Sequence, residues 1–165
     1  MIDNRSISLA SFDDLDLCDQ NMIKYAIEWA EKGFPKHRNT FVGCAMATIN
    51  GNIFCGTHIA HRRMHASTCA ERMALEKAQL SDPNIDKIYV WGKRRDRDFA
   101  NPVSSCGCCR QLIAENTNHS EVKNPTFYLC NTDLSSIAIT KLRCLLPLAF
   151  DREFGCYLDD CQIRG

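Results

Sequence analysis

Two short motifs contain the residues of this chain that are best suited to bind a metal. The first is Cys69-Ala70-Glu71-Arg72, and the second is Cys106-Gly107-Cys108-Cys109. Thiolates are common zinc ligands, and three of them leave one corner of a tetrahedral site open, as a catalytic zinc site requires. Glu71 follows the first thiolate by two residues, close enough to move protons at that corner. We therefore expect Cys69, Cys106 and Cys109 to bind Zn²⁺ and Glu71 to act as general acid and base.

Each motif is expected at the start of a helix. Ser67 or Thr68 could cap the helix that follows Cys69, and Ser105 could cap the one that follows Cys106. The positive end of a helix stabilises negative charge, so thiols placed there lose their protons readily. Cys106 and Cys109 lie one helical turn apart on one face, as two ligands of one ion must.

Simpler roles for the same residues stay open at this point. Thr68-x-x-Glu71 also fits a capping box, in which Glu71 would only bond back to a backbone amide. Cys106 and Cys109 could belong to a structural zinc knuckle, which would need a fourth ligand such as His65. The combination of the Glu with a Cys-x-x-Cys further along the chain favours the catalytic interpretation.

The composition narrows the class of protein. The chain has 165 residues, 45% of them hydrophobic, which suffices for one domain with a core. Twenty basic and twenty acidic residues cancel, so no overall field attracts a polyanion. The mixed run 93–98 is expected to be a solvated loop. No apolar stretch approaches the roughly 20 residues that span a bilayer, and eleven cysteines without a signal peptide indicate reduced thiols. We expect a cytoplasmic protein without membrane contact.

Hydrophobic periodicity predicts alternating helices and strands. The Asn50-Gly51 dipeptide favours a hairpin turn between two strands, because it tolerates the positive φ angles of a type I′ turn. The alternation indicates an α/β sandwich with a helix-covered sheet. A loose lead-in (1–17), one domain (18–150) and a tail (151–165) are expected. The predicted helices cover 20–32, 69–82 and 106–116, the predicted strands cover 41–49, 53–55, 85–91 and 126–130, and a short apolar element covers 140–146.

From about residue 20 to Phe150, the chain resembles the cytidine deaminase family. Its two motifs match the family's Cys-Ala-Glu-Arg and Cys-Gly-x-Cys-Arg-Gln, the latter through Arg110 and Gln111. Segments 39–45, 51–56 and 145–150 are similar to the family's opening strand, strand pair and closing Leu-Leu-Pro-x-x-Phe. The resemblance implies a three-layer α/β/α sandwich with a mixed sheet of about five strands. It also implies a homo-oligomer, a tetramer or a dimer, with active sites at subunit interfaces.

The resemblance further implies a zinc-dependent hydrolytic deaminase. Such an enzyme converts the 4-amino group of a cytosine-containing, nucleoside-like small molecule to a carbonyl and releases ammonia, with a glutamate carrying the protons. Arg72 would balance the charge of the thiolates. A nucleic-acid strand is not the expected partner, because strand-acting relatives typically have His in place of Cys69. The residues expected to contact the substrate are Phe41, His58, Ala60, Ala70, Ser104 and Phe150.

The segment after the predicted hairpin departs from the family. His58 and Ala60 stand where the family has the Asn and Glu that bind the ribose 3′-hydroxyl, and Ser105 replaces a Pro. Several basic residues follow, in an exposed loop or subunit interface, or else on a pocket rim for an anionic or hydroxyl-rich group. This segment partly resembles that of blasticidin S deaminase, which also lacks the Glu. The basic residues are His61, Arg62, Arg63 and His65.

These departures leave other functions open. The substrate could be a cytosine nucleotide, a blasticidin S-like compound or another amino-heterocycle. A non-catalytic, zinc-stabilised member of the family is a further alternative, and a polynucleotide-editing enzyme is a third. An intact ligand set together with Glu71 favours catalysis over a scaffold, since a scaffold does not need that carboxylate.

Overall fold

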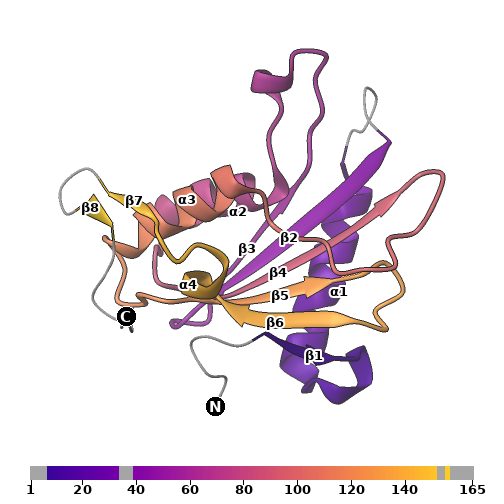
Figure 1. Cartoon of the computed structure of the whole chain (residues 1–165), viewed down its shortest axis with the longest axis horizontal. Coiled ribbons are helices and arrows are strands. Elements are labelled where there is room, and N and C mark those ends of the chain that lie inside the picture. The colour runs from indigo at the N-terminus through magenta and orange to yellow at the C-terminus, as the bar shows by residue number, and fades with distance from the viewer. Residues whose placement is uncertain (1–6, 34–38, 152–154, 157–165) are drawn as a thin grey trace, which may run out of the picture.

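A six-stranded mixed sheet forms the centre of the fold, with strand order β1-β6-β5-β4-β2-β3. The computed structural model describes residues 7–33, 39–151 and 155–156 (Figure 1). β4 and β5 pair in parallel, and the other neighbouring strands pair antiparallel. The strands are β1 (Ser8–Ala10), β2 (Thr40–Thr48), β3 (Ile53–Thr57), β4 (Ile85–Arg94), β5 (Thr126–Cys130) and β6 (Ile137–Lys141).

Helices cover both faces of this sheet (Figure 1). Because side chains alternate along a strand, Cys44 and Met46 of β2 join the core under α2 (Ala70–Gln79) and α3 (Gly107–Thr117), whereas Ala45 joins the core under α1 (Leu17–Glu31). The predicted three-layer α/β/α sandwich is therefore confirmed. The remaining elements are α1 (Leu17–Glu31), α2 (Ala70–Gln79), α3 (Gly107–Thr117), α4 (Leu142–Leu145), two 3-10 turns, η1 (Phe12–Asp14) and η2 (Met64–Ala66), and a separate strand pair, β7 (Phe150–Asp151) and β8 (Gly155–Cys156).

The structure differs from the sequence prediction mainly at the N-terminal end. Residues expected to form a loose lead-in contribute β1, which pairs with β6 and makes the sheet six strands wide instead of about five. The predicted hairpin is confirmed, with Ala47 opposite Ile53 and with Gly51 at φ +82°. Within the described ranges, no helix is long and apolar enough to cross a membrane. Most of the predicted tail, 151–165, lies outside the described residues.

Two glycines allow helices to lie directly on the sheet. A Cβ atom at Gly56 of β3 would lie 2.1 Å from the carbonyl oxygen of Ala70, in the first turn of α2. A Cβ at Gly43 of β2 would lie 1.8 Å from the carbonyl oxygen of Ala26, in α1 on the opposite face. No side chain fits either gap without displacing the helix, so these glycines set how closely α2 and α1 approach the strands.

One lysine connects the two helix layers around the edge of the sheet. Lys77 of α2 donates a hydrogen bond to the carbonyl oxygen of Cys55 in β3, at 2.7 Å. Its ammonium group also lies 4.1 Å from the ring centroid of Trp29 in α1, within cation–π range. β3 is the outermost strand on this side, so Lys77 spans the sheet edge to reach the other layer.

Replacing the two glycines should separate effects on the metal-ligand region from effects on stability. We expect Gly56→Ala and Gly43→Ala each to lower the free energy of unfolding by about 1–3 kcal/mol, the usual cost of overpacking. Only Gly56→Ala should also reduce zinc per folded molecule, because it displaces the turn between Cys69 and Glu71. Thermal unfolding and elemental analysis of the folded fraction measure the two effects. Equal zinc contents in the two variants would contradict this prediction.

Candidate metal centre and active site

Three thiols from two helix starts converge at one end of the sheet. Cys69 precedes α2, Cys106 precedes α3, and Cys109 lies in the first turn of α3. Their sulfur atoms all lie within 4.8 Å of one another, and the Sγ atoms of Cys69 and Cys106 are 4.0 Å apart. Tetrahedral zinc with Zn–S bonds of about 2.3 Å places its sulfur ligands about 3.8 Å apart. The Cys69–Cys106 separation is close to this value, and small shifts of the side chains would bring all three sulfur atoms within bonding distance of one zinc ion.

The thiols occupy the helix caps themselves. Cys69 is the N-cap residue of α2 and Cys106 that of α3, where the Cys106 sulfur accepts a hydrogen bond from the Cys109 amide at 3.4 Å. The predicted caps Ser67, Thr68 and Ser105 were therefore wrong. The capping box of Thr68 with Glu71 is absent too, because α2 begins one residue later than that box requires.

Without a metal ion, the geometry of the thiols favours their protonated forms. A hydrogen bond with the Cys69 thiol is the main cause that raises the pKa of Cys109, and burial raises it further. Crowded thiolates repel one another, so they need a compensating positive charge. A bound divalent cation reverses this preference, because a coordinating thiol gives up its proton. The cluster is thus electrostatically suited to a cation.

Glu71 lies buried beside this cluster. Only 5% of its surface is exposed, and burial raises the pKa of its carboxyl group. Its own backbone amide, the Ser105 hydroxyl and the charge of Arg110 act in the opposite direction on that pKa. The Ser105 hydroxyl finds no hydrogen-bond partner of ordinary geometry among the described residues, although it lies near enough to Glu71 to lower that pKa. A carboxyl group with a raised pKa in a cleft is suited to accept and return a proton.

An open cleft of about 220 Å³ leads to Glu71 and the thiols. Three of the predicted substrate contacts, His58, Ala70 and Ser104, line it. The cleft also has lining residues that the sequence reasoning did not single out, all of them on strands or on the loop before Cys106. These are Thr40, Val42, Val90 and Val103.

Phe41 lies on the other face of the sheet. Lys93 and Arg95 each lie 5.8 Å from its ring centroid, and the ring packs with the core under α1. Thr40 and Val42 alternate with Phe41 along β2 and line the cleft instead. The chain is one residue shorter here than the family pattern, and a shift of one residue moves a side chain to the opposite face.

Three further predicted residues do not line the cleft. Ala60 is buried, with 1% of its surface exposed, and Phe150 is 64% exposed. The side chain of Gln111 holds the Phe150 backbone, accepting from its amide at 3.0 Å and donating to its carbonyl at 2.6 Å. Arg72 forms an ion pair with Glu76 at 2.8 Å, and this partner is the main cause that raises the pKa of its guanidinium group. The substrate-binding and charge-balancing roles of these residues stay predictions.

The basic residues after His58 lie on an excursion between β3 and α2 that stands away from the body of the domain (Figure 1). His61, Arg62, Arg63 and His65 are all exposed, and none of them lines the cleft. His58 sits at the base of this excursion, where its ring Nδ1 lies 3.0 Å from the Thr68 carbonyl oxygen. A carbonyl oxygen only accepts, so Nδ1 carries the hydrogen, and the ring orientation is set.

Arg110 and a buried asparagine position the loop that precedes Cys106. Arg110 donates hydrogen bonds to the Ser104 hydroxyl and to the Leu145 carbonyl oxygen. Asn131, fully buried between β5 and β6, donates to the Ala100 carbonyl oxygen at 3.1 Å, and the Val103 amide donates to the Cys130 carbonyl oxygen. The loop is therefore attached to the sheet on one side and to α3 on the other.

Comparisons with known proteins agree with this geometry. Residues 17–123 match the family described as the cytidine and deoxycytidylate deaminase zinc-binding region. The chain belongs to this family. A cytidine deaminase from Halalkalibacterium halodurans is 32% identical over 136 residues, 81% of this chain and 95% of that protein. One from Sporosarcina psychrophila is 34% identical over 74% of this chain and 84% of its own length. The crystal structure of cytidine deaminase from Burkholderia pseudomallei superposes with a TM-score of 0.66 at 27% identity, over 79% and 97% of the two chains.

Zinc content should depend on individual thiols. We expect the purified protein to hold about one zinc ion per chain, and Cys106→Ala or Cys109→Ala to lose both the ion and thermal stability, because metal binding here is coupled to folding. Cys108→Ala is the matched control, since Cys108 is exposed on the same turn but outside the cluster. Elemental analysis and thermal unfolding provide the readouts. Zinc retained by both ligand variants would show that the ion binds elsewhere.

Proposed function

We propose that this chain is a zinc-dependent hydrolytic deaminase that replaces the 4-amino group of a cytosine-bearing small molecule with a carbonyl and releases ammonia. The observation that supports this best is the buried Glu71 carboxyl group beside three convergent thiols, Cys69, Cys106 and Cys109, at the base of an open cleft. The name cytidine deaminase, carried by its relatives from two bacteria, points to the same reaction.

The chain's own residues can carry the protons of this reaction. Zinc, when bound, supplies Lewis acidity that makes water available as a nucleophile near neutral pH. Glu71 takes a proton from the attacking water and passes it to the ring nitrogen N3. It then transfers the second proton of that water to the departing amino group, so that water and amine become a carbonyl and ammonia. Burial keeps the carboxyl group out of bulk water during both transfers.

A small molecule fits this site better than a nucleic-acid strand. The cleft of about 220 Å³ can take a heterocycle and its substituent, and no lysine or arginine of the described segments lines it. The basic side chains of the 61–65 excursion are exposed at its far end, and the formal net charge of the chain is zero. A strand-binding protein needs a positively charged groove along the backbone path, which this cleft does not offer.

We further propose a homo-oligomeric, cytoplasmic enzyme, a tetramer or a dimer. No Phe, Tyr or Trp side chain of the described residues lines the cleft, so the described part of the chain offers a bound base no large aromatic stacking partner there. Phe150 is 64% exposed on a backbone that Gln111 holds in place, as suits a side chain that contacts another subunit. Such a contact would complete the cleft of the neighbouring subunit.

The polar groups at the outer part of the cleft favour a substrate other than free cytidine. Among the described residues that line the cleft, Glu71 is the sole carboxylate, and it is needed for proton transfer. Thr40, His58 and Ser104 supply neutral or weakly basic groups in place of a sugar-binding carboxylate. A cytosine nucleotide, a blasticidin S-like compound or another substituted cytosine therefore remains the alternative substrate class, ahead of a non-catalytic scaffold.

Replacing the Glu71 carboxyl group by an amide should separate catalysis from structure. Glu71→Gln should retain zinc and a melting temperature close to the wild-type value while ammonia release falls by at least about 10²-fold, the usual contribution of a positioned acid–base group. Zinc content and far-ultraviolet circular dichroism are the controls. Activity retained per folded molecule would refute the catalytic role of Glu71 and leave the chain as a zinc-stabilised scaffold.

Substrate kinetics should show that His58 binds the substrate in the outer part of the cleft. We expect His58→Ala to lower kcat/KM for the preferred cytosine compound by roughly 10-fold, the effect of one hydrogen bond, chiefly through KM. Arg62→Ala and Arg63→Ala should be silent, because neither side chain lines the cleft. Screening cytidine, deoxycytidine, their monophosphates and blasticidin S for ammonia release identifies that compound. A silent His58→Ala with impaired arginine variants would show instead that the excursion reaches a cleft, its own or a neighbour's.

A further inference from the structure

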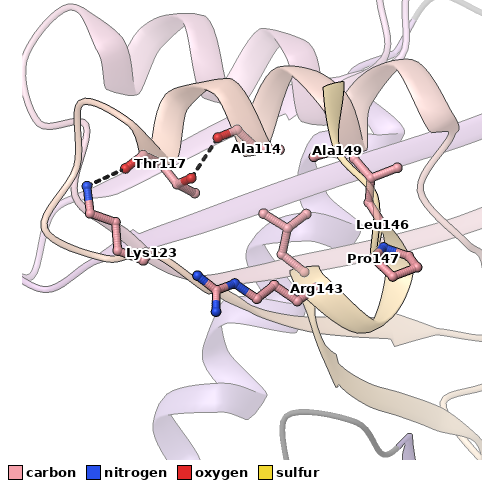
Figure 2. Close-up of a pocket in the computed structure, with 8 residues that line it drawn as sticks. Ala114, Thr117, Lys123, Arg143, Leu146, Pro147 and Ala149 are labelled. Carbon is pink, nitrogen blue, oxygen red and sulfur yellow. Dashed lines mark hydrogen bonds between the residues drawn. The ribbon is translucent and has the colours of Figure 1, made fainter. Parts of the chain in front are cut away.

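Basic side chains lie beside two hollows of the described structure. Figure 2 shows the first, a cavity of about 40 Å³ at the end of α3, where Lys123 donates a hydrogen bond to the Thr117 carbonyl oxygen at 2.9 Å and Arg143 contributes to the lining. This cavity shares no lining residue with the cleft above Glu71, so its cations are not part of that cleft. The second hollow is the cleft itself, whose outer end lies beside Arg94 of β4.

The pairing of β2 with β4 places Arg94 at the mouth of the cleft. Arg94 lies directly opposite Thr40, the first residue of β2, and Gly92 lies opposite Val42. Thr40 and Val42 both line the cleft, and residues that lie opposite each other in an antiparallel pair share a face of the sheet. Arg94 therefore lies on the cleft side of the sheet, next to the outer lining residue of β2.

The two basic neighbours of Arg94 take the opposite face, as alternation along a strand requires. The ammonium group of Lys93 lies 5.8 Å from the Phe41 ring centroid and 5.6 Å from that of Trp91, and both rings belong to the core under α1. The guanidinium group of Arg95 also lies 5.8 Å from the Phe41 ring centroid. Of these three consecutive basic residues, Arg94 is thus the one on the cleft side.

A glycine leaves the path along β4 open between the cleft and Arg94. A Cβ atom at Gly92 would lie 3.4 Å from the Cγ2 atoms of both Val42 and Val103, two residues that line the cleft. Arg94 lies four residues beyond Val90, another lining residue, which is about 13 Å at the rise of a strand. A bare heterocycle at the inner end of the cleft falls short of Arg94, whereas a ring with an extended substituent reaches it.

Arg94 has a partner that a ligand can replace. Nε and Nη2 of its guanidinium group donate hydrogen bonds to the two carboxylate oxygens of Asp96, at 3.0 and 3.3 Å. The two side chains are 33% and 53% exposed, and ion pairs this open to water contribute little to stability. Arginine binds phosphate and carboxylate groups through such a pair of parallel hydrogen bonds. The contact with Asp96 shows that the side chain presents this fork at the mouth of the cleft.

We propose that Arg94 is a specificity-determining residue that binds an anionic group, a phosphate or a carboxylate, on the substituent of the cytosine compound. This inference rests on the proposed function and names the substrate class of the same cleft. Asp96 holds the guanidinium group when no substrate is bound and gives it up to the substrate anion. Because Arg94 stands at the outer end of the cleft, it acts on substrate binding and not on the chemical step.

Kinetics of the zinc-loaded, full-length protein test this role through the ratio of kcat/KM for cytidine monophosphate to that for cytidine. Arg94→Gln should lower the ratio by roughly 10-fold, the effect of losing a charge-assisted hydrogen bond, through KM and not kcat. Lys93→Gln and Arg95→Gln remove the same charge from the other face and should change the ratio by less than about 2-fold. Lys123→Gln, at the cavity of Figure 2, controls for a remote charge. Equal losses in all four variants would show only a general field and would overturn the proposal.

Removing the competing carboxylate should have the opposite effect. Asp96→Asn should raise the same ratio by about 2–5-fold, because the substrate anion then displaces no ion pair. Blasticidin S, which carries a carboxylate, is the second arm and distinguishes that group from a phosphate. If the pair served the fold alone, Arg94→Gln and Asp96→Asn would lower the melting temperature together and leave the ratio unchanged, contrary to the proposal.

Direct binding separates this proposal from the proposed function. In the Glu71→Gln background, calorimetry compares cytidine with cytidine monophosphate without turnover. Adding Arg94→Gln should weaken binding of the monophosphate by roughly 10-fold, and this difference should shrink in 1 M salt, where the Debye length is about 3 Å. If no compound releases ammonia but the binding difference holds, the deaminase function fails and the anion site stands. Ammonia release from cytidine, with Arg94→Gln silent toward every anionic compound in kinetics and binding, would refute the anion site alone.

Discussion

Three sulfur atoms that repel one another once they lose their protons must be held within 4.8 Å, and much of this structure serves that constraint. Two of them cap helices, so the partial positive charge of α2 and α3 acts on them directly. Gly56 allows the start of α2 to lie directly against β3. Asn131, which follows β5, binds the loop before α3 through the Ala100 carbonyl oxygen. The helix ends offset only part of the repulsion among the three thiolates, and a bound divalent cation offsets the rest.

Features that depend on neighbours in the sequence could be predicted well. The ligand types and their spacing indicated the metal centre, because residues three apart on a helix necessarily share a face. The Asn50-Gly51 turn required only two residues and a positive φ angle. The layered fold followed from alternating periodicities. In each case, the physical cause acts over a few residues, so it is visible in the chain without knowledge of tertiary contacts.

Features that depend on register or on distant partners could not be predicted from the sequence. Phe41 lies opposite its expected face because one residue is missing before Val42, and only the pairing with β4 shows which face that is. β1 has little periodicity of its own and is ordered by β6. Cys69 took the cap position expected for Thr68, whose backbone instead pairs with Ile59. The role of Arg110 in positioning the loop before Cys106 depends on Ser104 and on Leu145, which lies 35 residues further along the chain.

The lysine that spans the sheet edge bears on how copies of this protein can associate. An outermost strand normally leaves backbone groups open to a strand from another molecule, which is a common route to aggregation. Here Lys77 occupies a carbonyl oxygen of β3 and places a charge over Trp29 at the same edge. A foreign strand would have to displace that charge and leave it unpaired. Sheet extension at β3 is thereby disfavoured, and assembly is directed to surfaces other than this edge.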